Sequence, residues 1–225
     1  MAAGGRQGDA AAQRALNQLC ETYWFPLYAY ARRRVANVAD AQDLTQAFFV
    51  DLLARQAVSA ATPTRGRFRA FLLTAFQRFL SKEWEKARAL KRGGGRPPLS
   101  LDFATADSAI GLEPATYLTP EQIFDQHWAL AVLRQTLARL ELELAQAGKQ
   151  DQFDELRGFI IGDHGETTYA QAATKLHMTE AAAKKAASRL RQRYRELLRA
   201  EIAQTVADPA EVDDEIRNLF TVLQF

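Results

Sequence analysis

The residue types that ligate zinc or form disulfides are scarce in this sequence. The chain of 225 residues has one cysteine, Cys20, and three histidines that lie far apart, His127, His164 and His177. A lone cysteine excludes an internal disulfide, and the histidine spacing does not supply the clustered ligands of a zinc site. We therefore expect neither a metal nor another cofactor.

Motifs for catalysis are equally weak. Asp163, His164 and Glu166 bring acidic and basic groups together around Gly165, but no nucleophile or ligand set accompanies them, which favours a solvated turn. The triple glycine at 93–95 lacks the Gly-Lys-Ser/Thr ending of a phosphate-binding loop. The sequence thus predicts no catalytic residue and a protein that is not an enzyme.

Recognition of nucleic acid is the chemistry that the sequence does indicate. Between residues 184 and 195, basic and amide side chains recur at helical spacing, opposite an apolar stripe that runs from Ala183 to Leu198. Arginine, lysine and glutamine bind phosphates and read base edges in a major groove. The predicted DNA contacts are Lys184, Lys185, Ser188, Arg189, Arg191, Gln192 and Arg195.

Two short elements would position this face. Thr168 with Gln171 forms a capping-box pattern that opens a helix ending near Leu176. A turn then leads to Thr179, the expected N-cap of the basic helix. This is the layout of a helix-turn-helix, although an αα-hairpin with a solvated basic face explains the pattern equally well.

Charge divides sharply along the chain. Residues 1–98 carry 16 Lys and Arg against 7 Asp and Glu, and residues 167–206 carry 8 against 3. The segment between them, 99–166, carries 4 against 12, and residues 207–225 carry 1 against 5. Two basic blocks are typical of a protein with two surfaces for a polyanion, with solvated helix faces as the alternative.

Helical residues dominate, and strand patterns are nearly absent, so we expect an all-α protein of two helical modules joined by a flexible linker. The linker is placed at 93–120 because it contains three glycines and two prolines. No secretory signal or membrane span is recognisable, which favours a cytoplasmic protein. The expected boundaries are 1–92 for an N-terminal bundle, 121–206 for the helix-turn-helix module, and 207–225 for an acidic amphipathic helix.

In the first module we expect helices over 9–20, 22–36, 41–53 and 67–91, with Pro26 in a first turn. The third has more apolar surface than one core requires. The fourth has an apolar stripe that includes Phe71 and Phe76, and a second, basic face with a residue every four positions. After the linker, Pro120 begins a long helix that ends near Gly148.

Three segments together carry a resemblance to a known family. The run Ala39-Asp40-Ala41-Gln42-Asp43-Leu44-Thr45-Gln46-Ala47-Phe48-Phe49 is similar to the polymerase-binding helix of extracytoplasmic-function (ECF) sigma factors of bacterial RNA polymerase. The segment from Arg67 through Arg92 is similar to their strand-opening segment, and 168–191 resembles their promoter-reading segment. The matches occur in the family's order across most of residues 15–200.

The resemblance implies partners and roles. Core RNA polymerase and promoter DNA become the partners, with an anti-sigma factor or another regulator as a further one. Polymerase binding falls to Asp43, Leu44, Phe48, Phe49, Leu52 and Leu53, with a central position in the bundle's own core as the alternative for each. Promoter opening falls to Arg67, Arg78, Lys82, Trp84 and Lys86, with the other phenylalanines of that helix in the core.

One departure from the family is structural. His177 stands at a turn position where the family usually has glycine, so a left-handed backbone there would be strained. The alternative function is a free-standing helix-turn-helix regulator that binds DNA as a symmetric dimer. The acidic tail is expected to fold onto the second module or its linker. A further hypothesis is that it screens the recognition helix until polymerase displaces it.

Overall fold

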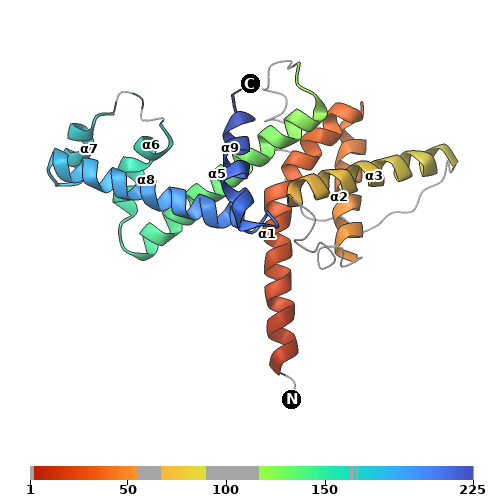
Figure 1. Ribbon diagram of the computed structural model, residues 1–225, viewed down its shortest axis with the longest axis horizontal. Helices are drawn as coiled ribbons and strands as arrows, with labels where there is room; N and C mark the ends of the chain where they lie inside the picture. The colour runs from red at the N-terminus through yellow and green to blue at the C-terminus, as the bar shows by residue number, and fades with distance from the viewer. Residues whose placement is uncertain (1–2, 55–66, 90–116, 163–164, 166, 225) are drawn as a thin grey trace. The chain divides into compact units, whose positions relative to one another are not determined.

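The computed structural model describes residues 3–54, 67–89, 117–162, 165 and 167–224, with backbone alone at 3–18, 53 and 87–89. These residues form eight α-helices, one 3-10 helix and no strand, which confirms the all-α prediction (Figure 1). The chain divides into two compact units. Unit 1 comprises Met1–Ala131 and Thr205–Phe225, and unit 2 comprises Val132–Gln204. The predicted linker lies outside the described residues except at its last four positions.

The first helix is longer than the sequence indicates. Helix α1 (Ala3–Arg34) is continuous through Pro26, so the prediction of two helices over 9–20 and 22–36 is wrong. Proline inside a helix costs about 3 kcal/mol because it removes a hydrogen bond and crowds the preceding turn. Leu27, Tyr28 and Tyr30 beside it are fully buried, and this burial offsets the cost of the proline.

Helices α2 (Val38–Ala54) and α3 (Phe68–Ala89) complete the N-terminal bundle. The ring of Phe48 on α2 lies 4.9 Å from that of Phe76 and 5.6 Å from that of Phe79, both on α3. Thr45 is fully buried, and its hydroxyl donates to the carbonyl of Ala41 at 2.7 Å. The core of unit 1 is therefore built largely from aromatic rings of α1, α2 and α3.

Helix α5 (Pro120–Gln146) begins where Pro120 predicts and is followed by Gly148 with a positive φ of 68°. A capping box starts it, since Thr119 Oγ1 accepts from the Gln122 N–H at 3.2 Å and Gln122 Oε1 accepts from the Thr119 N–H at 2.8 Å. Its first residues, through Ala131, belong to unit 1, where Trp128 is fully buried. The remaining turns belong to unit 2.

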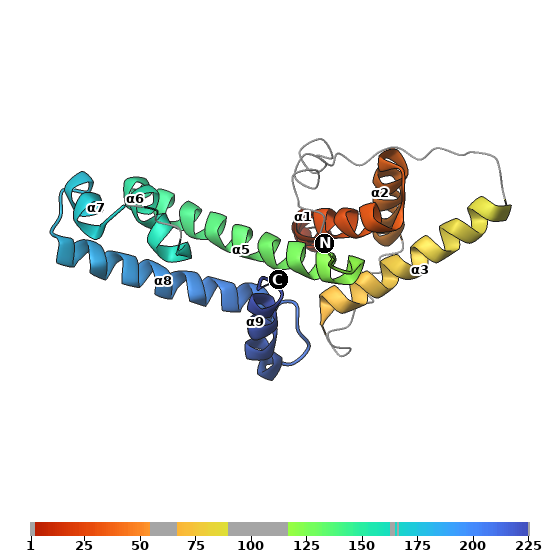
Figure 2. The same cartoon turned by 90° about the horizontal axis from the view of Figure 1, so that it is seen from above.

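Unit 2 consists of the second part of α5 with α6 (Gln150–Ile161), α7 (Tyr169–Lys175) and α8 (Glu180–Ala203). In Figure 2, α8 runs beside α5 in the opposite direction. Arg193 of α8 pairs with Glu143 of α5 at 2.8 Å. Between the helices lie the buried side chains of Leu140, Phe153 and Leu197. This frame holds α7 and the start of α8.

The tail forms a 3-10 turn, η2 (Pro209–Glu211), and then helix α9 (Val212–Thr221). The two lie in unit 1, and Glu215 of α9 pairs with Arg69 of α3 and with Arg67, which immediately precedes α3. From the sequence we expected this helix to fold onto the second module or its linker, whereas the structure places it in unit 1. The partner that the structure provides is the start of α3.

Candidate nucleic-acid interface

Local hydrogen bonds fix the start of α7. Thr168 Oγ1 accepts from the Gln171 N–H at 3.3 Å, and Gln171 Oε1 accepts from the Thr168 N–H at 2.8 Å. The predicted capping box is therefore confirmed with both of its hydrogen bonds. Ala172 and Ala173 are the buried residues of this short helix, and their small size lets α7 lie close to its neighbours.

A tight turn joins α7 to α8. His177 has a φ of 51°, which is the left-handed conformation that would be strained at a residue other than glycine. The Met178 N–H donates to the carbonyl of Ala173 at 3.0 Å, which closes the turn. Thr179 then caps α8, its side chain accepting from the Ala182 N–H at 3.2 Å. The turn fixes the direction in which α8 leaves α7.

Helix α8 has the two faces that its sequence predicts. The buried residues on its inner face are Ala183, Ala187, Leu190, Leu197, Leu198 and Ile202. Tyr194 is half-buried on the same side, and its hydroxyl donates to the carbonyl of Leu133 at 3.2 Å. Burial raises the pKa of Tyr194 to about 12.

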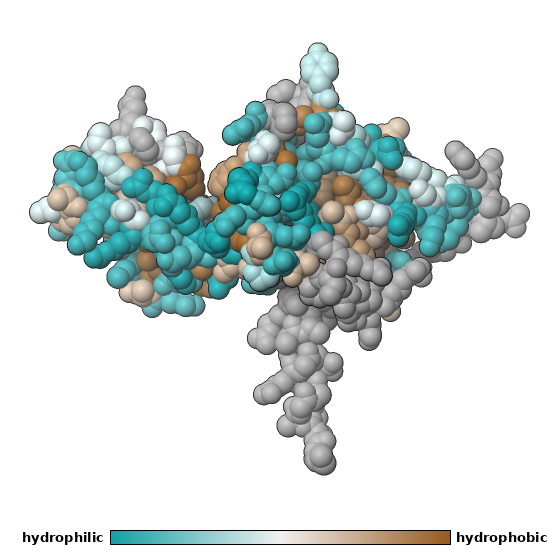
Figure 3. All heavy atoms as spheres, viewed as in Figure 1, coloured by the Kyte–Doolittle hydropathy of each residue, from teal (hydrophilic) through white to brown (hydrophobic). Residues whose placement is uncertain are grey.

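The predicted DNA-binding residues lie on the outer side of α8. Lys184, Lys185, Ser188, Arg189, Gln192 and Arg195 are exposed, and Arg191 is half-buried. Figure 3 shows the face of this helix in view as mostly hydrophilic. Lys184, Ser188, Arg191 and Arg195 recur at spacings of three and four, so they form one row along the helix. The structure brings this part of the predicted set together.

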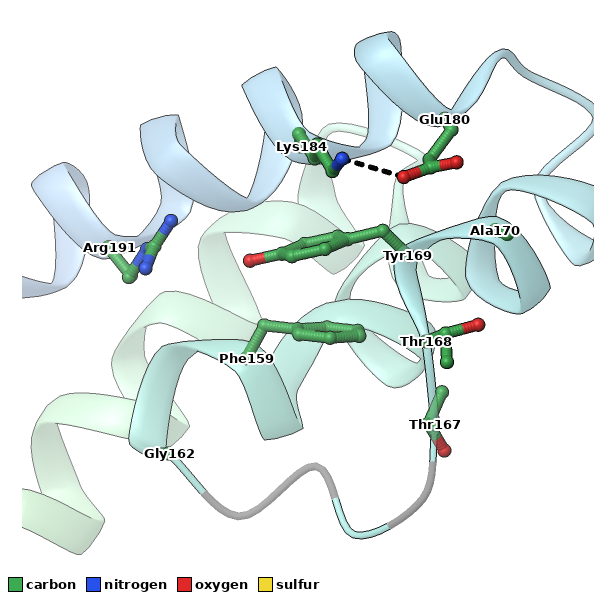
Figure 4. Close-up of a pocket in the computed structure, with 9 residues that line it drawn as sticks. All are labelled: Phe159, Gly162, Thr167, Thr168, Tyr169, Ala170, Glu180, Lys184 and Arg191. Atoms are coloured by element: carbon green, nitrogen blue, oxygen red, sulfur yellow. Dashed lines mark ion pairs between the residues drawn. The ribbon is translucent and has the colours of Figure 1, made fainter.

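Beside this row lies an open cavity of about 480 Å³, shown in Figure 4. Its floor is a stacked pair of rings, Phe159 and Tyr169, with centroids 4.1 Å apart. Lys184 and Arg191 of α8 line the other side, and Lys184 Nζ lies 2.6 Å from Glu180 Oε1. The hydrogen bond to Glu180 and the charge of that carboxylate raise the pKa of Lys184. Two cations thus flank an aromatic surface at the start of α8.

A second basic face lies on α3 in unit 1. Arg78, Lys82 and Lys86 are exposed along it at intervals of four residues, as predicted. Trp84, the predicted aromatic contact, is half-buried instead of fully exposed. Lys86 Nζ pairs with Glu83 at 2.6 Å within the same helix.

Phe71 is an exposed aromatic residue of α3 that was not among the DNA contacts predicted from the sequence. The sequence assigns it to the buried stripe, but the side chain is 40% exposed, so that prediction is wrong. Leu72 and Phe76 supply the buried contacts of this part of α3. Phe71 precedes Arg78 by seven residues, which places it on the basic face. The seven-residue spacing to Arg78 could have placed Phe71 on the basic face, but an apolar side chain is normally assigned to the buried stripe.

Arg67, another predicted promoter contact, is engaged by the tail. Its Nε lies 2.9 Å from Glu215 Oε2, and its side chain remains 36% exposed. The neighbouring Arg69 is buried, pairs with Glu215 and Asp125, and lies over the ring of Trp128. Burial alone would lower the pKa of the Arg69 guanidinium. Its hydrogen bonds to Glu215 and the negative charge of Asp125 outweigh that effect and raise the pKa. Sequence reasoning did not identify Arg69.

The predicted polymerase-binding residues of α2 differ in solvent exposure. Asp43 is exposed and Leu44 is half-buried, so both are accessible to a partner. Phe48, Phe49 and Leu52 are 3%, 0% and 5% exposed. These three side chains thus lie in the core of the bundle, which was the alternative to polymerase binding in the sequence analysis. The side chain of Leu53 lies outside the described residues.

The acid–base cluster at 163–166 is described only at Gly165, and its three ionisable residues lie outside the described part of the chain. Elsewhere, the described residues contain no group of three His, Cys, Asp or Glu side chains that could hold a metal ion. Among the described helices, none has the length and apolar character needed to cross a membrane.

Comparison with known proteins identifies the N-terminal bundle. Residues 20–89, which contain the last 15 residues of α1 together with α2 and α3, match the family model for Sigma-70 region 2. Searches of curated proteins and of solved structures found no match. Sigma factors direct RNA polymerase to promoters and are not a family of enzymes. The match shows that the N-terminal bundle is similar to region 2 of sigma-70 factors, and it does not extend to the rest of the chain.

Proposed function

We propose that this protein is a sigma factor of the ECF type, which recruits core RNA polymerase to specific promoters. The observation that carries the proposal is the region 2 match over residues 20–89. It is supported by the capped α7–α8 pair that follows in a separate unit. In this proposal residues 1–92 form the region 2 module, 93–120 the linker and 121–206 a helix-turn-helix module of region 4. A protein with this role acts in the cytoplasm, where the polymerase is.

In the first module, α3 would hold the upstream promoter element. Arg78, Lys82 and Lys86 are exposed cations on one face and suit successive phosphates of a strand. Phe71 is the exposed aromatic side chain on that face, so we assign to it the stacking on an unpaired base, in preference to the half-buried Trp84.

Helix α2 would dock on the polymerase through its accessible side chains. Asp43 and Leu44 meet the partner directly, whereas Phe48, Phe49 and Leu52 act from the core by holding α2 in place. This division follows from their burial, since a fully buried ring contacts no second protein without unfolding of the bundle.

Helix α8 would enter the major groove as a recognition helix. The row of Lys184, Ser188, Arg191 and Arg195 supplies cations to phosphates and hydrogen-bonding groups to base edges. Lys185, Arg189 and Gln192 flank the row, and the turn at His177 sets its direction. The alanines at 181, 182 and 186 leave specificity to these polar residues.

The test is gel filtration of the purified chain with sigma-free core RNA polymerase, followed by run-off transcription from genomic DNA fragments. Co-elution with new transcripts is the expected result. Absence of co-elution, together with binding of duplex DNA by the chain alone as a symmetric dimer, would instead establish the free-standing regulator. An anti-sigma factor would be detected as a protein that blocks co-elution.

Single substitutions on α8 test the recognition face. We expect Lys184→Ala and Arg191→Ala each to weaken promoter binding, with a phosphate contact lowering the slope of log K against log salt by about one. Arg157→Ala is a matched control, because Arg157 is an exposed arginine of α6 in the same unit. Equal promoter output from all three variants would refute the placement of the recognition face.

A further inference from the structure

The tail helix α9 carries a charged residue where its pattern calls for an apolar one. Val212 and Leu219 are 4% and 0% exposed, and Glu215 lies between them on the same face with an exposure of 1%. A carboxylate at such a position is unfavourable unless cations and hydrogen bonds compensate it. The role of Glu215 is therefore defined by the groups that it faces.

Those groups lie at the start of α3, where Arg67 immediately precedes the helix and Arg69 is its second residue. Glu215 Oε1 lies 2.5 Å from Arg69 Nε, and Glu215 Oε2 lies 2.9 Å from Arg67 Nε and 3.4 Å from Arg69 Nη2. A backbone hydrogen bond adds to these contacts, since the Phe68 N–H donates to the carbonyl of Thr205 at 2.8 Å. The tail therefore holds the start of α3 by its backbone and by a carboxylate.

The two arginines differ in what they are free to do. Arg69 is 7% exposed and has two further contacts, with Asp125 and with the ring of Trp128. These contacts hold Arg69 in the core in addition to its pairing with Glu215. Arg67, one residue before α3, has a side chain that is 36% exposed, so its guanidinium remains accessible to another anion.

We propose that α9 is an intramolecular acidic cover which occupies Arg67 in place of a DNA phosphate and must leave before α3 binds promoter DNA at full strength. The proposal rests on the proposed function, which assigns Arg67 and the basic face of α3 to DNA. A guanidinium binds carboxylate and phosphate through the same planar fork, so one anion can replace the other without leaving the cation unpaired.

The composition of α9 suits a displaceable element. It has ten residues, and three of its first four are acidic: Asp213, Asp214 and Glu215. A helix this short is unstable in isolation, so its order depends on docking. Its acidic first turn would also repel a DNA strand that approaches Arg67. Release of α9 thus exposes a cation and removes nearby negative charge.

The first experiment measures binding of the full chain to a fluorescein-labelled single-stranded oligonucleotide by anisotropy over a range of salt concentrations. We expect Glu215→Gln to raise the affinity and to steepen the slope of log K against log salt by about 0.7, the value for one added phosphate contact on a single strand. Asp214→Asn is the matched control, because it removes the same charge from an exposed position of the same helix that pairs with Arg217. Equal effects of the two substitutions, or no effect of Glu215→Gln, would overturn the proposal.

Two further variants separate this result from general changes. Arg67→Ala should cancel the gain produced by Glu215→Gln, because Arg67 is the group released; a persisting gain would count against the proposal. Arg78→Ala tests the proposed function itself, since Arg78 lies on the basic face of α3. If Arg78→Ala has no effect on binding, the proposed function fails and the proposal fails with it. If it weakens binding while Glu215→Gln changes nothing, the cover alone is refuted.

A measurement on the unsubstituted chain guards against variants that fail to fold. Hydrogen exchange of the α9 amides, Val212–Thr221, is followed by mass spectrometry with and without the oligonucleotide. Faster exchange of α9 in the presence of DNA is expected if the helix is displaced. Unchanged or slower exchange would show that α9 stays docked and would overturn the proposal.

Discussion

Replacing Phe49 by alanine distinguishes a core residue from a polymerase contact. Phe49 is fully buried, and its ring packs edge to face against that of Phe48 with centroids 5.8 Å apart. Removing a buried phenylalanine side chain leaves a cavity and costs roughly 3–5 kcal/mol. That loss is a large fraction of the roughly 5–15 kcal/mol that stabilises a typical domain. We therefore expect Phe49→Ala to destabilise unit 1 severely.

The three tryptophans of the sequence make the measurement selective. Trp24, Trp84 and Trp128 all lie in unit 1, so tryptophan fluorescence reports the unfolding of that unit. With an m-value of about 2 kcal/mol/M in urea, the loss lowers the unfolding midpoint by about 2 M. Phe49→Leu, which leaves a smaller cavity, should shift the midpoint in the same direction by less.

Asp43→Ala is the matched surface variant on the same helix. Asp43 is exposed, so its removal should change the free energy of unfolding by no more than about 0.5 kcal/mol. Co-elution with core polymerase should nevertheless weaken, because Asp43 is accessible to the partner. The reasoning is refuted if Phe49→Ala leaves the unfolding midpoint unchanged and abolishes co-elution, since Phe49 would then be a contact residue.

Two predictions concern unit 2, followed by far-UV circular dichroism in urea. His177→Gly should raise the free energy of unfolding of unit 2 by roughly 0.5–1 kcal/mol, because glycine adopts a φ of 51° without strain, at some entropic cost. Gly162→Ala should lower the free energy of unfolding of unit 2 by about 1 kcal/mol, because alanine is strained at a φ of 79° even though no atom lies within 4 Å of the added Cβ. A destabilising His177→Gly would contradict this. Tyr194→Phe should cost about 1 kcal/mol by removing the hydrogen bond to Leu133. Burial raises the pKa of Tyr194 from 10 to about 12, so the unfolded chain releases this proton first. Unit 2 should therefore lose stability as the pH rises from 10 toward 12, and Tyr194→Phe should abolish that loss.

The sequence determined the features that depend on near neighbours in the chain. Thr168 and Gln171 are three residues apart, so their capping box forms from local hydrogen bonds alone. The start of α5 at Pro120, the left-handed turn at His177 and the two faces of α8 are local in the same sense. For the two segments before the linker, the resemblance to a sigma factor agrees with the match over 20–89.

Features that depend on distant partners were decided by the tertiary structure. Helix α1 continues through Pro26 because surrounding residues are buried against other helices, and no local rule predicts that burial. Phe71 and Phe49 are both phenylalanines in amphipathic helices, yet one is 40% exposed and the other fully buried. Glu215 acquires its partners only because packing brings α9 to the start of α3, 146 residues away in sequence from Arg69. Periodicity identifies the faces of a helix, but the residues that cover a face come from elsewhere in the chain, so only the folded structure decides which face is buried.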